Sequence, residues 1–245
     1  MTIDRAMPPR WKEVLLEECG STFTEARRHP AWTIVSTVRQ THGRGRFNRA
    51  WFGEPGGLWM SCNLPLAGNA PWGMLPLVAG AALFRALQPL CIPGLRLRWP
   101  NDLMVRRGKL AGILVERPAA DLASVGIGMN VFNDVLSLHG RTADVPVRLA
   151  DLAAHCPQLP QLRLGIADAL ADTFAAFAGQ GAAALIPMLE PAWGPSLPVV
   201  AVTDSARVCG FFHGIQADGS PILRRADGSF ATVPAVAVNA LRELV

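Results

Sequence analysis

The sequence predicts an α+β protein, with a mixed β-sheet domain flanked by helices and then a small β-rich module. Alternating, β-branched runs such as residues 33–39 are typical of strands. Residues 71–90 and 162–178 are apolar at helical spacing. After residue 195 the pattern changes to short β runs separated by Asp-Gly turns. We therefore expect two domains, over residues 1–194 and 195–245.

Each expected element follows from its local pattern. Strands of the first domain are predicted where residues alternate or are β-branched, at 33–39, 58–64, 95–99, 103–105, 110–116 and 124–129. Helices are predicted from apolar spacing at 11–18, 22–28, 71–90, 147–155, 162–178 and 185–193. Residues 133–145 resemble a loop. Residues 197–238 should form a small antiparallel sheet or barrel, packed separately and without catalytic residues.

Composition narrows the class of protein. The chain has 245 residues, of which 50% are hydrophobic and only 17% charged, which supports a packed core and argues against a coiled coil. We find no uninterrupted apolar stretch of about eighteen residues, as a membrane helix needs, and no apolar signal core at the N-terminus. The five cysteines include no C-x-x-C pair, which argues against a disulfide framework or a zinc site. These features predict an intracellular globular protein.

Lysine is rare in this chain. All but two of the 23 basic residues are arginine, and the exceptions are Lys12 and Lys109. An ammonium is compact and mobile, whereas a guanidinium is planar and binds through a fixed fork. Lys109 therefore stands out as a position where the ammonium itself is needed.

The first motif is a Gly/Arg loop from Gly43 to Trp51. Glycines allow the backbone to approach an anion closely, and arginines bind phosphate or carboxylate oxygens through two points. Trp51 offers a flat face to a purine ring or an arginine. These residues suit a nucleotide's phosphates, although a solvated arginine-rich turn would have the same composition. Neither G-x-G-x-x-G nor G-x-x-x-x-G-K-[ST] occurs, which excludes the Rossmann and P-loop modes.

The second motif is Arg98-Trp99-Pro100-Asn101-Asp102, followed by Lys109-Leu110-Ala111-Gly112-Ile113-Leu114. A strand that ends in Pro-Asn-Asp places an amide and a carboxylate at a strand terminus, where functional sites are common. Asp102 is suited to Mg²⁺ beside a polyphosphate, and Asn101 to a base edge. Ordinary turn chemistry gives the same Pro-Asn-Asp signal.

Taken together, the motifs resemble those of the biotin protein ligases, within the wider biotin/lipoate ligase fold. The matching pieces appear in the family's order: Gly20-Ser21-Thr22, Gln40 to Trp51, Arg98 to Asp102, Lys109 to Leu114, and Gly126-Ile127-Gly128-Met129-Asn130. The resemblance covers roughly residues 14–178. It implies a class II synthetase-like fold with an SH3-like C-terminal barrel.

The resemblance also implies a chemistry. Biotin's carboxylate attacks the α-phosphate of ATP, and a lysine of a biotin carboxyl carrier domain then attacks the resulting biotinyl-5′-AMP. The catalytic residues implied are Lys109, Arg44 and Arg46, with Asp102 holding Mg²⁺. The residues implied to bind biotin or ATP are Ser21, Thr22, Gln40, Gly43, Gly45, Arg49, Trp51, Asn101, Gly112 and Gly128.

Three positions depart from the family's pattern. Phe23 stands where the family has Asn, Phe47-Asn48 replace Arg-Gly in the flexible loop, and Arg98 replaces Lys. Two alternatives therefore stay open: a lipoate- or octanoate-type ligase or acyltransferase of the same fold, and a divergent ligand-binding homologue without catalysis.

The resemblance bears on partners as well. About twenty residues precede Gly20, fewer than the sixty or so that a DNA-binding winged helix needs, so no DNA partner is expected. We expect no membrane partner, a cytoplasmic location, and either a monomer or a homodimer.

Overall fold

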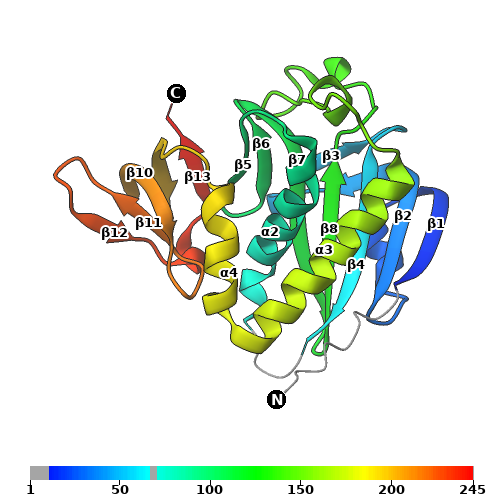
Figure 1. The fold of residues 1–245 in the computed structure, drawn as a ribbon, viewed down its shortest axis with the longest axis horizontal. Coiled ribbons are helices and arrows are strands. Elements are labelled where there is room, and N and C mark those ends of the chain that lie inside the picture. The colour runs from blue at the N-terminus through cyan, green and yellow to red at the C-terminus, as the bar shows by residue number, and fades with distance from the viewer. Residues whose placement is uncertain (1–10, 67–70, 245) are drawn as a thin grey trace.

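The computed structural model describes residues 11–66 and 71–244 (Figure 1). The first ten residues lie outside this range. They belong to the N-terminal segment in which the sequence shows no apolar signal core. The first domain is built on an eight-stranded sheet. Its strands are β1 Lys12–Cys19, β2 Thr33–Arg44, β3 Ala50–Gly53, β4 Leu58–Pro65, β5 Leu95–Arg98, β6 Asp102–Val105, β7 Gly108–Ala119 and β8 Leu122–Met129.

The sheet is mixed, as the sequence predicts. Its strand order is β1-β2-β4-β8-β7-β6-β5, with β3 paired to β2 outside this path. The β1–β2 pair is parallel, and the other pairs are antiparallel. The helices are α1 Thr22–Ala26, α2 Leu75–Leu87, α3 Leu159–Gln180 and α4 Ala182–Leu189. Figure 1 shows α2 and α3 crossing one face of the sheet.

The two faces of β8 carry different residues because side chains alternate along a strand. Val125 and Ile127 belong to the hydrophobic core that includes α2 and α3. Gly126 and Gly128, between and beyond them, point to the opposite face, and Gly128 lies directly across from Gly112 of β7. The helix-covered face is therefore bulky and apolar, whereas the other face is nearly bare.

Helix α2 lies in the core of this domain. By length and composition alone, the helical run Trp72–Leu90 could cross a membrane, although 56% of it is buried inside the fold. Ten residues of α2 itself are buried, including Val78 and Leu83 at full burial. The apolar character of this run is accounted for by its packing between the sheet and α3.

Two predicted helices are wrong. Residues 11–18 form most of β1, an edge strand paired in parallel with β2, because the sheet satisfies this backbone despite its helix-favouring Leu and Glu residues. Residues 147–155 contain only the 3₁₀ turn Leu149–Asp151. Their amides donate to strand ends instead, as Leu149 N–H does to the carbonyl of Asn130.

The C-terminal module is a five-stranded antiparallel sheet, in the order β12-β11-β10-β9-β13. Its strands are β9 Pro198–Val202, β10 Arg207–Ile215, β11 Pro221–Arg224, β12 Phe230–Thr232 and β13 Ala240–Glu243. It fits a small SH3-like domain, although within the described residues no pairing between β12 and β13 closes a barrel. The boundary near residue 195 stays a prediction.

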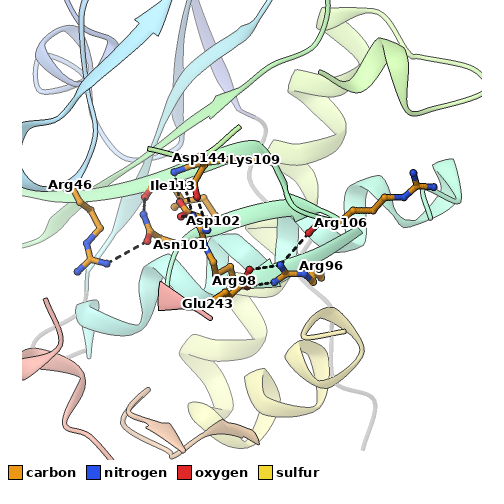
Figure 2. Close-up of polar contacts among 10 residues, drawn as sticks. All are labelled: Arg46, Arg96, Arg98, Asn101, Asp102, Arg106, Lys109, Ile113, Asp144 and Glu243. Atoms are coloured by element: carbon orange, nitrogen blue, oxygen red, sulfur yellow. Dashed lines mark hydrogen bonds and ion pairs between the residues drawn. The ribbon is translucent and has the colours of Figure 1, made fainter. Parts of the chain in front are cut away.

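The module is joined to the first domain by buried polar contacts. Arg96 of β5 forms a two-point ion pair with Glu243 of β13, with 2.7 Å between Nη2 and Oε2 (Figure 2). The same Nη2 donates to the carbonyl of Arg106 at 3.2 Å. Trp99 Nε1 donates to the carbonyl of Gly219 at 2.9 Å. The module is therefore not separately packed, as the sequence suggested, but docks against the β5 edge of the larger sheet.

This docking predicts that Glu243→Gln destabilises the protein. The side chains of Arg96 and Glu243 are only 7% and 16% exposed, so the change leaves a nearly buried guanidinium without its counter-charge. We expect the free energy of unfolding in urea to fall by about 2 kcal/mol. Asp172→Asn removes the exposed ion pair with Arg85 and should cost less than about 1 kcal/mol. Equal effects of the two changes would contradict this account of the docking.

Candidate active site

A pocket of about 900 Å³ opens beside the bare face of β7 and β8. Most residues that the sequence singled out line it: Thr22, Gln40, Arg44, Gly45, Arg46, Arg49, Trp51, Asn101, Asp102, Lys109, Gly112 and Gly128. Ser21 and Gly43 adjoin the lining without forming part of it. Ser21 is 4% exposed, and its Oγ has no hydrogen-bond partner. Gly43 pairs with Trp51, where a Cβ would lie 2.4 Å from the Trp51 carbonyl oxygen.

At one end of the pocket, polar side chains fix the orientation of Gln40. Its Oε1 accepts from the backbone N–H of Thr22 at 2.9 Å and lies 3.2 Å from the Thr22 hydroxyl. Ser61 Oγ, which is fully buried, donates to the same hydroxyl oxygen at 2.8 Å. These contacts direct the Nε2 end of the Gln40 amide away from Thr22. This end of the pocket therefore offers oriented hydrogen-bonding groups beside apolar walls.

The glycines of β7 and β8 form a platform for two aromatic rings. A Cβ on Gly128 would lie 2.6 Å from Trp51 Cε2, and one on Gly112 would lie 2.9 Å from Trp51 Cζ3. A Cβ on Gly126 would lie 2.3 Å from Phe23 Cζ. Both rings thus rest against backbone that larger residues would block. Gly112 and Gly128 support Trp51 here, and their predicted contact with a ligand stays a prediction.

The Gly/Arg loop folds into a short turn between β2 and β3. Phe47 and Asn48 have positive φ angles of 56° and 55°, and Gly45 N–H donates to the carbonyl of Arg49 at 2.8 Å. Arg44 pairs with Glu116 at 3.2 Å. The guanidinium of Arg49 lies 5.9 Å from the exposed Phe47 ring. The turn therefore brings the arginines to the pocket, which Phe47 also lines although its side chain is largely exposed.

Arg46 is the most enclosed cation of this loop. Burial lowers the pKa of Arg46, and the nearby charge of Asp102 only partly opposes that effect. Its Nη1 lies 3.4 Å from Asn101 Oδ1. Its guanidinium also lies 5.0 Å from the centre of the Phe47 ring. A partly buried guanidinium without a paired carboxylate among the described residues is well suited to receive an anion.

Asn101 is held by the strand beside it. Its Nδ2 donates to the carbonyl of Ile113 at 2.7 Å, and the N–H of Ile113 donates to the carbonyl of Asn101 at 2.8 Å. Oδ1 faces Arg46. One of the two N–H groups of Nδ2 is therefore occupied by Ile113, and the oxygen faces Arg46. The predicted reading of an adenine edge by Asn101 stays a prediction.

The strand ends beside Asn101 bring four charges together in alternation. Arg98 Nη2 lies 2.6 Å from Asp102 Oδ2 and 2.6 Å from Asp144 Oδ2, while Nη1 donates to Asp144 Oδ1 at 2.8 Å. Lys109 Nζ lies 2.6 Å from Asp102 Oδ1 and 5.5 Å from the Trp51 ring centre. Figure 2 shows these four side chains as one group beside Asn101. We call Asp144, Arg98, Asp102 and Lys109 the charge chain.

The charge chain keeps the carboxylate of Asp144 ionised. Burial acts to raise the pKa of Asp144, yet the hydrogen bonds and charge of Arg98 outweigh it and hold that pKa below its usual value. Burial likewise opposes the charge of Arg98, but Asp144 and Asp102 together raise its pKa. At neutral pH the pair is therefore fully charged.

Asp102 could bind a divalent cation only together with ligands from outside the protein. Its Oδ1 is buried and has no aligned hydrogen-bond donor, although Lys109 Nζ lies close by. Within residues 11–66 and 71–244, no group of three or more His, Cys, Asp or Glu side chains could hold a metal. Mg²⁺ commonly uses one or two carboxylates together with phosphates and water. Asp102 therefore fits Mg²⁺ only in company with a polyphosphate.

The structure adds residues that sequence reasoning missed. Leu138, Arg141 and Asp144 line the pocket from the segment between β8 and α3, to which we assigned no role. Arg242 of β13 also lines it, so the C-terminal module forms part of the pocket wall. No spacing or motif in the sequence marks these positions, because only the packing of distant segments brings them to the site.

Comparisons with known proteins agree with this architecture. The model of the Biotin/lipoate A/B protein ligase family matches residues 21–130. The biotin--[acetyl-CoA-carboxylase] ligase of Paracoccus denitrificans is 32% identical over 222 residues, covering 85% of this chain and 89% of that one. The enzyme of the same name from Mycobacterium tuberculosis is 39% identical over 135 residues, covering 49% and 50%. The fold is similar to that of the Aquifex aeolicus biotin protein ligase in complex with biotin and ATP, with a TM-score of 0.82, 23% identity, and coverage of 95% and 99%.

The glycine platform predicts that Gly128→Ala destabilises the protein. Its new Cβ would lie 2.6 Å from Trp51, which must then move. We expect the free energy of unfolding to fall by about 1–3 kcal/mol, as is typical of overpacking. Gly165→Ala in α3 is the control, because a Cβ there meets nothing within 4 Å and the change should stabilise by about 0.4–1 kcal/mol. If Gly128→Ala were as stable as the control, Trp51 would not rest on this platform.

Proposed function

This chain belongs to the biotin protein ligase family, and from that premise we propose that it activates biotin as biotinyl-5′-AMP and transfers it to a lysine of a biotin carboxyl carrier domain. The observation that carries the proposal is the position of Lys109. Its side chain is 22% exposed at the pocket wall, and its ammonium is bound to the carboxylate of Asp102. It is a compact cation at the place where anions would have to meet.

In the first step a carboxylate oxygen of biotin attacks the α-phosphorus of ATP. The new P–O bond forms as the bond to the bridging oxygen breaks, and pyrophosphate leaves with that electron pair. Two negative groups must approach each other, so the main task of the protein is to position them and to stabilise charge on oxygen. Lys109 would bridge the carboxylate and the α-phosphate. Arg46 and Arg44 would close over the same oxygens from the Gly/Arg loop.

In the second step the amine of the acceptor lysine attacks the acyl carbon of biotinyl-5′-AMP. The C–N bond forms, the C–O bond to AMP breaks, the amine loses a proton, and AMP leaves. A buried anhydride must be protected from water until the acceptor arrives. The aromatic rings of Trp51 and Phe23, both resting on the glycine platform, supply apolar walls suited to this.

For the substrates, Thr22, Gln40 and Ser21 are proposed to bond the ureido group of biotin. The fixed orientation of Gln40 and the unpaired buried hydroxyl of Ser21 support this assignment. Trp51 and the Oδ1 of Asn101 are proposed to contact adenine. The proposed Mg²⁺ would be held by Asp102 and phosphate oxygens, and when bound it would neutralise phosphate charge.

Phe23 favours consideration of a different acyl substrate. It rests on Gly126 in the pocket that Gln40 also lines, where an amide side chain could instead have bonded a polar ring. A lipoate or octanoate chain needs no such amide. We therefore propose mixing the protein with ATP, Mg²⁺ and each acid in turn, and detecting acyl-adenylate by mass spectrometry. Biotinyl-adenylate alone supports the proposal, octanoyl- or lipoyl-adenylate supports the alternative, and no adenylate contradicts both.

The remaining parts of the proposal concern partners. We propose that the chain acts without DNA or membrane, as a monomer or homodimer, and in the cytoplasm, where ATP for the first step is available. The arginines around the pocket mouth suit phosphates and an acidic acceptor surface equally well.

Lys109 gives the sharpest prediction of this proposal. Lys109→Ala should lower the rate of biotinyl-adenylate formation by about a hundredfold or more, as the loss of one oxyanion-stabilising donor does. Lys109→Arg should restore little, because a planar fork cannot occupy the point position of an ammonium. Lys12→Ala changes the other lysine, which is exposed on β1, and should leave the rate unchanged. Near-normal adenylation by well-folded Lys109→Ala would remove Lys109 from the mechanism.

A further inference from the structure

Asp144 lies in a segment that the proposed mechanism does not use. It follows the 3₁₀ turn Leu136–Leu138 in the long connection between β8 and α3, and its side chain is 27% exposed. Both of its carboxylate oxygens accept from Arg98, across 46 residues of sequence. The Asp144 carbonyl also accepts from the hydroxyl of Thr142 at 2.8 Å. This two-point contact anchors the loop to Arg98 of the charge chain.

The contact between Asp144 and Arg98 first affects the charge that Asp102 experiences. Arg98 Nη2 is shared between Asp102 and Asp144 at equal distances of 2.6 Å. Because Arg98 also compensates Asp144, it neutralises less of the negative charge of Asp102. The two positive and two negative members of the charge chain cancel as a set. Lys109 is bound at its end, where the pocket begins.

The segment that begins at Asp144 also holds the backbone of Lys109. The N–H of Lys109 donates to the carbonyl of Val145 at 2.8 Å, and the N–H of Val147 donates to the carbonyl of Lys109 at 3.0 Å. Pro146 lies between these two in a bridge parallel to Lys109. A Cβ on Gly108 would lie 2.3 Å from Val147 Cγ1, so the two segments touch closely. Residues 144–147 thus brace Lys109 from the side that faces away from β6.

We propose that Asp144 is a positioning residue for the adenylation step, which acts through Arg98 and the backbone of residues 145–147 to place the ammonium of Lys109. The inference rests on the proposed function, because it assigns to Lys109 the anion that arrives in that step. On this proposal Asp144 acts on Lys109 through these groups and not by binding substrate itself.

Adenylation requires Lys109 to exchange one anionic partner for another. Lys109 must release Asp102 to take up the carboxylate and phosphate, and Asp102 must not then be left as an uncompensated buried charge. Arg98 remains on Asp102 and supplies that compensation. Asp144 keeps the guanidinium anchored by two bonds while the exchange occurs. Without the charge of Asp144, Arg98 would be drawn wholly to Asp102, and the Asp102–Lys109 contact would weaken before any substrate binds.

The first experiment follows Lys109 directly and needs no catalysis. The chain has only two lysines, so limited acetylation with acetic anhydride at fixed pH, read by peptide mass spectrometry, compares Lys109 with Lys12 in one sample. In Asp144→Asn we expect Lys109 to be acetylated about threefold faster relative to Lys12, because a partly exposed ion pair holds the ammonium only weakly once its neighbour has changed. Asp144→Glu should keep the wild-type ratio. Asp172→Asn, which removes the surface pair with Arg85, is the matched control and should also keep it.

The second experiment measures adenylation by the same variants. We expect Asp144→Asn to lower kcat for biotinyl-adenylate formation by about tenfold while the KM for biotin stays unchanged, because a misplaced group costs most in the transition state. Asp144→Glu should recover most of the rate. A merely structural role would lower stability and rate together in both variants, and the glutamate would not rescue.

The outcomes separate the two proposals. If Asp144→Asn leaves both acetylation and kcat unchanged, or if Asp144→Glu fails as badly as Asp144→Asn, the positioning role is overturned. If wild-type protein forms no adenylate from any acid, the proposed function fails. In that case faster acetylation of Lys109 in Asp144→Asn would still support the positioning of Lys109 by Asp144. An unchanged ratio of Lys109 to Lys12 acetylation would overturn it.

Discussion

The alternation of side chains along β7 and β8 is the constraint on which the other features of the molecule depend. A strand turns successive residues to opposite faces, so these two strands can be bulky toward α2 and α3 and bare on the other side at Gly112, Gly126 and Gly128. The bulky face supplies a continuous core. The bare face lets Trp51 and Phe23 lie directly against backbone. One short pattern of alternating glycine thereby creates both the stability of the sheet and the space for a ligand.

Charge is concentrated where that platform ends. Asp102 and Lys109 lie on neighbouring strands, and Arg98 reaches Asp102 from β5. Burying four charges is tolerable only because each has an opposite neighbour within hydrogen-bond distance. The short Asp102–Lys109 distance also makes this ion pair sensitive to substrate, since an arriving anion competes with Asp102 for Lys109. The Arg96–Glu243 pair lies on the same edge of the sheet and secures the module that forms another wall of the pocket.

Local patterns predicted much of this from sequence, and long-range contacts set the limit. Strands such as 33–39 and 58–64 are found where the sequence predicts them, and Gly112 of the Lys-Leu-Ala-Gly motif lies against Trp51 in the pocket wall. The helix predicted at residues 11–18 is wrong because pairing with β2 outweighs the helix preference of Leu and Glu. Asp144 was missed because its partner Arg98 is 46 residues away, and nothing local distinguishes this aspartate from one in any polar loop.

The central claim is that Lys109 exchanges the carboxylate of Asp102 for the anions of the substrate. A crystal structure of the protein with a non-hydrolysable analogue of biotinyl-5′-AMP tests this most directly. The account predicts that Lys109 Nζ lies within hydrogen-bond distance of the analogue's acyl or phosphoryl oxygen, and that Arg98 still bonds both Asp102 and Asp144. An analogue bound in the pocket with Lys109 still paired to Asp102, or bound elsewhere, would contradict it.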